Sequence, residues 1–342
     1  MKTQSVGFAV ALVIAILFCS CKKDPDDPNI TKLPIWKTYD QSNGLVNNNV
    51  YDIAVDATGN KWFAVSSYSP EVDAKAGLSK FDGTNWTTYT TANSGLVNNR
   101  TTALEFDLEG NLWVGYGQTT EGSGVSKFDG TEWTTYTSSN SGLASDQVTA
   151  IAIDSLGNKW FGSSNGLSKF DGSVWTNFNS QNGLGSDFVF EITVDHENNV
   201  WVGTWGGGVS KYDGTNWMVY NRSNSGLPEN IITAIAVDKQ GVKWFGTSTL
   251  GVVKFDDEIW TAYNSYNTNM LSNNISDIAI DKNGVKWIST NGWGVSSFNG
   301  QYWSTYSPEY GYTDYFVTCI CIDNDNKKWF GTYEKGAISL ED

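Results

Sequence analysis

The sequence predicts an all-β fold, a seven-bladed β-propeller of four-stranded blades, and three observations support this prediction. A D-x-x-x-x-x-W motif occurs seven times, always with the tryptophan six positions after the aspartate. A second tryptophan, followed three residues later by an aromatic residue, also occurs seven times. The two ends of the chain carry complementary fragments of one repeat. Together these features indicate a single closed ring of repeats.

The two tryptophan positions account for fourteen of the 16 tryptophans of the chain. The first motif is formed by Asp56/Trp62, Asp107/Trp113, Asp154/Trp160, Asp195/Trp201, Asp238/Trp244, Asp281/Trp287 and Asp323/Trp329. The second tryptophan lies at Trp36, Trp86, Trp133, Trp175, Trp217, Trp260 and Trp303. Because a functional pocket does not need seven equivalent copies of a side chain, we expect these tryptophans to build the scaffold.

Each repeat contains four short runs of β-forming residues. In the third repeat they are VTAIAID, KWFGS, GLSKFD and WTNF, and the turns DSLGN and DGSV join them. Aspartate and glycine favour tight turns, and no segment shows a sustained helical period. The seventh repeat ends at GAISLED without a fourth strand, whereas the repeats are preceded by an unpaired IWKTYD. We therefore expect this N-terminal strand to complete the last blade and close the ring.

The N-terminal residues differ in kind from the repeats. Residues 1–20 combine a positive start at Lys2 with an apolar run too short to cross a membrane, which predicts a signal peptide. Cys21 follows a small serine, whereas Cys19 follows a bulky phenylalanine, so Cys21 is the expected lipidation site. The alternative is an ordinary cleaved signal that leaves a soluble periplasmic protein.

The segment FCSC-KKDPDDP resembles the lipoprotein signals of Gram-negative bacteria, in particular those of surface-exported lipoproteins of the Bacteroidota. The resemblance implies a diacylglyceryl anchor on Cys21 and attachment to the outer membrane, on the periplasmic or the cell-surface side. Residues 21–33 are then an acidic tether, and residues 34–342 form the propeller.

The composition narrows the choice of partners. The formal net charge of -15 repels phosphate backbones and anionic lipid, so nucleic acid is excluded as a partner and membrane contact is left to the acyl anchor. Cys319 and Cys321 lie two apart in a predicted strand, which favours buried side chains over a disulfide or a metal site. We expect a monomer without cofactor or metal.

Units such as NSGLASDQVTAIAIDSLGNKWFGSSNGLSKFDG resemble the two-component regulator propeller repeat, the module of extracytoplasmic sensor regions in hybrid histidine kinases of Bacteroidota. The resemblance extends over residues 34–342 and implies a sensor-like, ligand-binding propeller. No transmembrane, kinase or receiver segment follows Asp342, so we expect a stand-alone lipoprotein rather than a sensor that transfers phosphate. Such a resemblance implies the fold more firmly than the function.

The two ends of the predicted blades differ in variability. In an up-and-down blade, the short uniform turns share one end, and the loops between strands two and three share the other with the blade-to-blade loops. Irregular loops on a rigid repeat are where scaffolds place binding residues. The candidate ligand-binding residues at this variable end are Trp205, Trp293, Tyr68, Tyr116, Tyr333, Arg100, Tyr315 and Phe316.

These residues predict a function without catalysis. Exposed aromatic rings stack on apolar sugar faces, and Arg100, just before an innermost strand, suits a ligand carboxylate. We expect a glycan or a partner protein as the ligand. A structural subunit of an outer-membrane complex is another alternative.

A polysaccharide lyase or glycoside hydrolase is the enzymatic alternative, with Glu71, Asp73 and Glu121 of the longer loops as candidate acids and bases. The single histidine, His196, is expected in a short turn away from the variable end. Four acids are predicted on innermost strands, where they either hold a cation or line a water-filled channel: Asp52, Glu105, Glu191 and Asp277.

Overall fold

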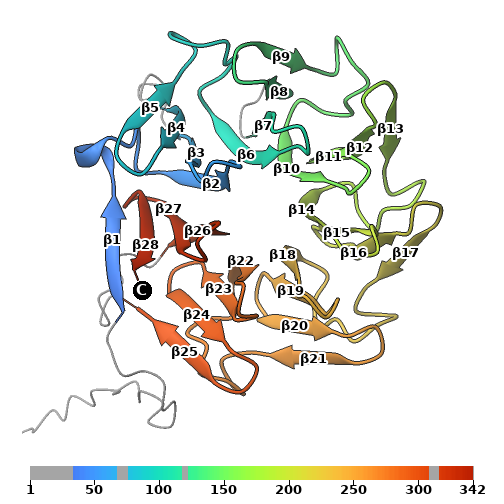
Figure 1. Cartoon of the computed structure of the whole chain (residues 1–342). Coiled ribbons are helices and arrows are strands. Elements are labelled where there is room, and N and C mark those ends of the chain that lie inside the picture. Colours follow the sequence, from blue (N-terminus) through green and yellow to red (C-terminus); the bar gives the residue numbers. More distant parts are fainter. Residues whose placement is uncertain (1–33, 68–75, 118–121, 308–315, 342) are drawn as a thin grey trace, which may run out of the picture. The chain divides into compact units, whose positions relative to one another are not determined.

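The computed structural model describes residues 34–67, 76–117, 122–307 and 316–341. Their strands form seven antiparallel sheets of four strands each, arranged around a central axis within the compact unit Leu33–Asp342 (Figure 1). This confirms the predicted seven-bladed β-propeller.

The blades are numbered along the chain, and the strands of each blade run in order from the innermost to the outermost. Blade 1 is β2 (Val50–Val55), β3 (Lys61–Val65), β4 (Gly77–Phe81) and β5 (Trp86–Tyr89); blade 2 is β6 (Thr101–Phe106), β7 (Leu112–Tyr116), β8 (Val125–Phe128) and β9 (Trp133–Tyr136). Blade 3 is β10 (Val148–Ile153), β11 (Lys159–Ser163), β12 (Gly166–Phe170) and β13 (Trp175–Phe178); blade 4 is β14 (Val189–Val194), β15 (Val200–Thr204), β16 (Gly208–Tyr212) and β17 (Trp217–Tyr220). Blade 5 is β18 (Ile232–Val237), β19 (Lys243–Thr247), β20 (Val252–Phe255) and β21 (Trp260–Tyr263); blade 6 is β22 (Ile275–Ile280), β23 (Lys286–Thr290), β24 (Gly294–Phe298) and β25 (Trp303–Tyr306). Blade 7 is β26 (Val317–Ile322), β27 (Lys328–Thr332), β28 (Ala337–Glu341) and β1 (Ile35–Tyr39), and the short 3₁₀ helix η1 (Gln41–Asn43) follows β1.

The ring closes through the first strand of the chain. β1 pairs antiparallel with β28, so that Trp36 lies opposite Leu340 and Tyr39 lies opposite Ala337. Figure 1 shows β1 as the outer strand of the blade that β26, β27 and β28 begin. The closure predicted from the incomplete seventh repeat is therefore confirmed, and the last blade has its four strands.

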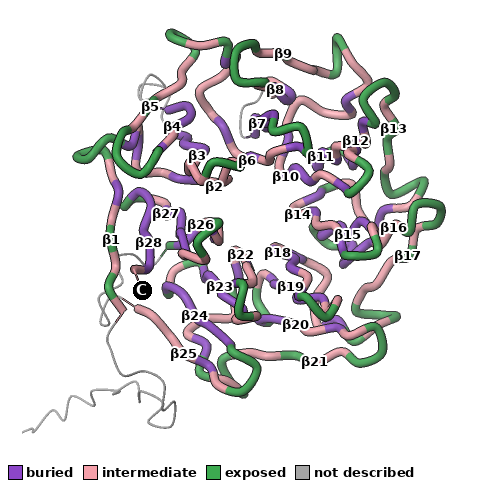
Figure 2. Tube along the Cα trace, in the orientation of Figure 1, coloured by how far each residue is buried: buried purple, intermediate pink, exposed green. Residues whose placement is uncertain are grey.

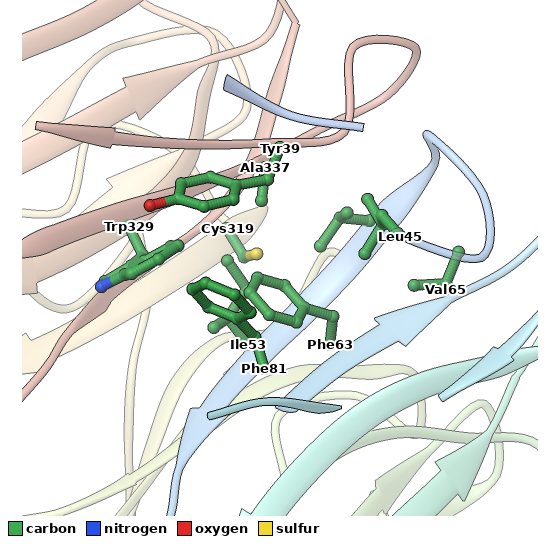
Figure 3. Close-up of a cluster of buried hydrophobic side chains, with 10 residues drawn as sticks. Tyr39, Leu45, Ile53, Phe63, Val65, Phe81, Cys319, Trp329 and Ala337 are labelled. Atoms are coloured by element: carbon green, nitrogen blue, oxygen red, sulfur yellow. The ribbon is translucent and has the colours of Figure 1, made fainter. Parts of the chain in front are cut away.

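The hydrophobic core is divided among the blade interfaces. In the described residues, buried side chains form seven clusters, and each contains residues of two adjacent blades. The cluster between blades 7 and 1 packs Tyr39 and Trp329 against Phe63 and Phe81, and it includes Cys319 (Figure 3). Figure 2 shows that the buried residues concentrate on the inner strands of the blades, and exposed residues gather at the turns.

The repeated tryptophans belong to these clusters, as predicted. Each large aromatic side chain buries on the order of 150–250 Å², so these tryptophans contribute a large part of the apolar area buried between neighbouring blades. In blades 1 to 6 the second tryptophan stacks on the aromatic residue that ends strand three, as Trp86 does on Phe81 with ring centroids 4.7 Å apart. Cys319 is buried and Cys321 is half-buried, and both are free thiols, which agrees with the predicted absence of a disulfide.

Each innermost strand contains a β-bulge at its start. In all seven blades the register with the second strand shifts between the first and the third residue, for example between Val189 and Glu191 in blade 4. A bulge leaves one residue out of the ladder and redirects its side chain. The second residue of each innermost strand thereby becomes available to line the channel.

Candidate functional site

At the end of the blades that carries the short turns, the side chains form a regular set of hydrogen bonds within the protein. In blade 4, one oxygen of Asp195 accepts from the backbone amides of Glu197 and Asn199, at 3.0 and 2.8 Å. The other oxygen accepts from Nε1 of Trp201 at 2.8 Å. The six-residue spacing thus lets one carboxylate hold both the turn and the indole of the following strand.

The same indole–carboxylate bond recurs in every blade. The Nε1–Oδ2 distances are 3.2 Å for Trp62–Asp56, 2.9 Å for Trp113–Asp107, 3.0 Å for Trp160–Asp154, 2.8 Å for Trp201–Asp195, 3.2 Å for Trp244–Asp238, 3.2 Å for Trp287–Asp281 and 3.0 Å for Trp329–Asp323. Burial by itself would raise the pKa of Asp56, but hydrogen bonds from Thr58, Asn60 and Trp62 lower it to about 2. These aspartates therefore have a structural role in every blade.

The opposite end of the ring opens into a pocket of about 910 Å³, which we call the mouth pocket. This volume lies in the range of roughly 300–1,000 Å³ that is usual for small-molecule sites. The second residue of every innermost strand lines it: Tyr51, Thr102, Thr149, Phe190, Thr233, Ser276 and Thr318. The site is therefore built by all seven blades around the channel axis.

Five of these second residues carry hydroxyl groups that connect neighbouring blades. Each hydroxyl donates to the carbonyl oxygen of the first residue of the next innermost strand. The oxygen–oxygen distances are 3.1 Å for Thr102–Val148, 2.7 Å for Thr149–Val189, 2.7 Å for Thr233–Ile275, 2.6 Å for Ser276–Val317 and 2.5 Å for Thr318–Val50. The bond from Thr318 crosses the closure of the ring.

The two second residues without an aliphatic hydroxyl, Tyr51 and Phe190, place aromatic rings in the pocket. Phe190 belongs to an aromatic cluster of blade 4, with its ring centroid 5.1 Å from Phe188 and 5.4 Å from Trp205. The backbone amide of Trp205 donates to the carbonyl of Phe188 at 2.9 Å, which fixes the loop after β15 beside the start of β14. Trp205 is 54% exposed and forms the outer part of this cluster.

A second aromatic group lies on the other side of the pocket. Phe316 and Tyr333 of blade 7 line it, together with Tyr51 of blade 1. The amide of Tyr333 donates to the carbonyl of Phe316 at 3.2 Å, the same arrangement that holds Trp205 beside Phe188. Blade 4 is three blades away from both blade 7 and blade 1 in the ring (Figure 1), so the two aromatic groups belong to opposite walls of the mouth pocket.

Below the mouth pocket, a polar cavity of about 620 Å³ runs between the innermost strands. Asp52 in this cavity accepts from the amides of Ile53 and Leu104, both at 2.7 Å, and so bridges blades 1 and 2. Asp277 bridges blades 6 and 7 through the amides of Ile278 and Ile320, both at 2.6 Å. The carboxylates thus satisfy amides on the exposed edge of the innermost strands.

The acids of the channel bind protons more tightly than free carboxyl groups. Burial raises the pKa of Asp277 to about 6 and that of Asp52 to about 7. Burial, together with the charge of Asp52, raises the pKa of Glu105 to about 8, and the pKa of Glu191 is raised well above its usual value. The described residues contain no group of three or more His, Cys, Asp or Glu side chains arranged to hold a metal ion.

Some of the predicted ligand-binding residues lie at the mouth pocket, and others do not. Phe316 and Tyr333 line the mouth pocket, and Trp205 joins its blade 4 wall. Trp293 is 56% exposed in the loop after β23 and is not among the lining residues. Arg100 is half-buried and is likewise not a lining residue, so its role stays a prediction.

The expectation that Tyr116 presents an exposed ring is wrong. Tyr116 is the last residue of β7, is fully buried, and donates from its hydroxyl to Oγ of Ser126 at 2.9 Å. Its side chain belongs to the cluster between blades 1 and 2, and the equivalent last residue of β11, Ser163, is buried as well. Tyr68, Tyr315 and Cys21 lie outside the described residues.

The residues that sequence reasoning missed are Tyr51 and Phe190. Both occupy the second position of an innermost strand, where the other blades have Thr or Ser. The sequence shows this contrast. Strict alternation of side chains along a strand does not predict which residues face the channel, because the bulge at the start of each innermost strand shifts the alternation. Gln147 and Phe188, which precede innermost strands, also line the pocket.

The single histidine of the chain lies in the short turn where the sequence predicts it. Exposed His196 lies in the turn between β14 and β15, and its Nε2 is 2.9 Å from the carbonyl oxygen of Asp238, at the end opposite to the mouth pocket. Glu71, Asp73 and Glu121 lie outside the described residues.

Comparison with protein families finds one match. Residues 183–206, which include Phe188, Phe190 and Trp205, match the model of the two component regulator propeller. This match confirms the resemblance on which the repeat was recognised. The search of curated proteins returned no match.

Solved structures resemble the chain over most of its length. The extracellular domain of the hybrid two-component system BT3049 from B. thetaiotaomicron is 22% identical with a TM-score of 0.75; the match covers 90% of this chain and 41% of that domain. Virginiamycin B lyase from Staphylococcus aureus is 13% identical with a TM-score of 0.70, and the match covers 90% of this chain and 99% of the lyase. PorZ of Porphyromonas gingivalis, a surface component of the type-IX secretion system, is 18% identical with a TM-score of 0.65 over 86% of this chain and 46% of PorZ.

At these identities the likeness shows the fold alone. The chain spans about two fifths of the length of the BT3049 domain. In the part of the chain that the structure describes, no helix has the length and apolar character needed to cross a membrane.

Proposed function

We propose that this chain, which carries a two component regulator propeller repeat at residues 183–206, binds a carbohydrate in the mouth pocket without catalysing a reaction. The observation that carries the proposal is the pair of aromatic groups on opposite walls of the pocket. Flat rings of this kind bind the apolar faces of sugars, and hydroxyl and amide groups between them suit sugar hydroxyls. Both types of group line the mouth pocket.

The distribution of polar groups supports a binding role over the lyase alternative. A variant of the staphylococcal lyase in which one histidine is replaced by alanine is catalytically inactive. The single histidine of this chain, His196, lies at the short-turn end. The acids that lie in the channel are engaged with backbone amides or have raised pKa values, as Asp52 and Asp277 illustrate.

A glycan array with the purified protein tests the proposal, and thermal shift with the bound glycans confirms the hits. We expect Trp205→Ala and Phe316→Ala to weaken binding about tenfold or more, because each removes a ring that stacks on the sugar. Tyr266→Ala is the matched control, because Tyr266 is an exposed aromatic residue that does not line the pocket. Equal loss in the control variant, or no binding to any glycan, would contradict the proposal.

Trp293 is proposed as an outer contact for ligands that extend beyond the pocket over blade 6. Its exposed ring also suits a partner protein, which is the second ligand class for this end of the propeller. If the protein binds no glycan but Trp293→Ala abolishes capture of an outer-membrane protein, the partner-protein function replaces the carbohydrate function.

We also propose, from the sequence, that Cys21 carries the acyl anchor of an outer-membrane lipoprotein. Labelling of expressing bacteria with radioactive palmitate is expected to mark the protein. The label is expected to disappear in Cys21→Ser and to remain in the matched variant Cys19→Ser. Palmitate-free protein in the outer membrane fraction would contradict the anchor.

A further inference from the structure

Five of the side chains that line the mouth pocket have hydroxyl protons that are already engaged within the protein. Thr102, Thr149, Thr233, Ser276 and Thr318 use their hydroxyl protons for the carbonyl oxygens of the next blade. A hydroxyl has one proton and two lone pairs, so these five groups present acceptors to the pocket. A ligand that matches them is therefore rich in donors.

Two carboxyl groups line the mouth pocket. Glu191 lies at its floor, next to Phe190 on β14, and lines both the mouth pocket and the cavity below it. Glu334 lies on an exposed turn at the rim. Among the described lining residues there is no lysine, arginine or histidine. A cationic group on the ligand is attracted by Glu334 at the rim, and beside Glu191 it favours the ionised form of that side chain.

Glu191 is the acid with capacity left for a ligand. Both oxygens of Asp52 and of Asp277 accept backbone amides. Glu191 accepts a hydrogen bond from the backbone of Ile192, and a carboxylate offers about four lone-pair positions. Its position at the floor of the mouth pocket directs the remaining capacity toward a bound ligand.

The surroundings of Glu191 favour a positive ligand group. Burial is the main cause of its raised pKa, and the charges of Asp277, Asp52 and Glu105 add to it. The thiols of Cys319 and Cys321 lie in the same channel, and burial raises the pKa of both, so they carry no compensating charge. An ammonium group beside Glu191 offsets this repulsion and lies close to the face of an aromatic ring, where cations are also attracted.

We propose that the mouth pocket selects a sugar that carries a free amino group, with the ammonium bound to Glu191 and the sugar ring between the two aromatic groups. This inference rests on the proposed carbohydrate function and specifies its ligand class. The ammonium supplies three donors and no acceptor, which suits the lone pairs of these five hydroxyl groups and of Glu191. An N-acetylated sugar lacks the positive charge and adds a carbonyl oxygen that needs a hydrogen-bond donor. These five hydroxyl groups cannot donate to it, because their protons are already engaged.

The test is calorimetric titration at pH 7 of the purified protein with three β-1,4-linked tetrasaccharides, of glucosamine, of N-acetylglucosamine and of glucose. We expect the glucosamine probe to bind about tenfold or more tightly than the other two, as for other charge-assisted hydrogen bonds. In Glu191→Gln this preference is expected to fall to about twofold or less.

Glu105→Gln is the matched control, because Glu105 lies in the cavity below and is not a lining residue of the mouth pocket. It is expected to keep the full preference, and circular dichroism checks the fold of both variants. Binding of all three probes with equal affinity overturns the amino-sugar inference but leaves the carbohydrate function standing. Binding of none overturns both, and a preference that survives in Glu191→Gln overturns the assignment to this residue.

Discussion

The two ends of the blades differ in how regularly their polar side chains are hydrogen-bonded within the protein. At the short-turn end, each aspartate of the repeat holds a turn and an indole, as Asp195 does with Trp201 at 2.8 Å. Four of these aspartates also pair with a lysine of the next blade, for example Asp238 with Lys286 at 3.2 Å. At the mouth, the side chains differ between blades and leave a pocket of about 910 Å³.

This difference shows how one repeat can provide both a scaffold and a site. The indole–carboxylate bonds of the short-turn end recur in all seven blades and fix the turn and the second strand within each blade. The second residue of an innermost strand, in contrast, is Thr or Ser in five blades and an aromatic residue in two. Specificity can then arise from the two blades that depart from this pattern, which are blades 4 and 1.

The largest expected effect contrasts two tryptophans of blade 4 that are four positions apart. Trp201 is fully buried between blades, and Trp205 is 54% exposed at the mouth. Trp201→Ala is expected to lower the free energy of unfolding by about 3–5 kcal/mol, because it leaves a cavity and removes the indole hydrogen bond to Asp195. Trp205→Ala is expected to cost less than about 1 kcal/mol. Urea denaturation measures both, and equal losses would remove the distinction between scaffold and site.

A smaller effect is expected for the aspartates. Asp195→Ala removes the acceptor of a buried indole and of two backbone amides, which is expected to cost about 2–3 kcal/mol. Asp213 makes a similar turn on the outer edge of blade 4, where it is exposed and accepts from the amides of Thr215 and Asn216. Asp213→Ala is the control, and thermal unfolding should show a much smaller loss. A comparable loss would mean that the buried indole bond contributes little.

The stability of the protein should depend on pH in opposite directions for an acid at the short-turn end and for an acid in the channel. Asp56 has a pKa lowered to about 2 from 3.8, so its contribution is present above pH 3.8 and is lost as the pH falls toward 2. Glu105 has a pKa raised from 4.5 to about 8, so its contribution is full below pH 4.5 and is lost as the pH rises through 8. We expect the melting temperature to be highest near pH 4–5.

Glu105→Gln tests the channel part of this pH dependence. The variant is expected to lose less stability than the wild type between pH 5 and pH 9, by about 2 °C in Tm, because the channel admits water and weakens the effect. Calorimetry over this range measures it. A decrease as steep as that of the wild type would show that Glu105 does not take up a proton in the folded state.

The smallest expected effect concerns a turn residue. Asn198 adopts a positive φ of 66° where five other blades have glycine, and its side chain accepts from the amide of Ser155 in blade 3 at 2.7 Å. Asn198→Gly removes this bond but relieves the backbone, so we expect a loss of less than about 1 kcal/mol. Asn326→Gly should behave alike, because Asn326 accepts from Lys282 at 2.7 Å. A gain in stability in both variants would show that backbone relief outweighs the bond between blades.

The repeats made the architecture predictable. The D-x-x-x-x-x-W spacing recurs seven times, so the interpretation of one blade is supported by the other six. The unpaired first strand occurs once and predicts how the ring closes. The predicted ring closure was confirmed by the pairing of β1 with β28. The reason for the six-residue spacing, a single carboxylate shared by a turn and an indole, became visible in the structure.

The site was less predictable, because it depends on departures from the repeat. The sequence around Tyr116 predicts a loop, although the residue ends a strand and is buried. Phe190 escapes prediction because a bulge determines that it faces the channel. Trp205 is a candidate from the sequence because it lies outside both repeated tryptophan positions. Residues that deviate from the repeat therefore predict where the candidate site lies. Whether each of them faces the channel depends on the β-bulges of the innermost strands, which the composition does not reveal.

The most direct test of the mouth pocket as the binding site is hydrogen–deuterium exchange with and without the strongest glycan ligand. Binding between blades 4 and 7 is expected to slow exchange in residues 186–192 and 316–319 and to leave the turn at residues 195–199 unchanged. Slower exchange at the turn together with no change at the mouth would contradict the assignment and place the ligand at the other end of the ring.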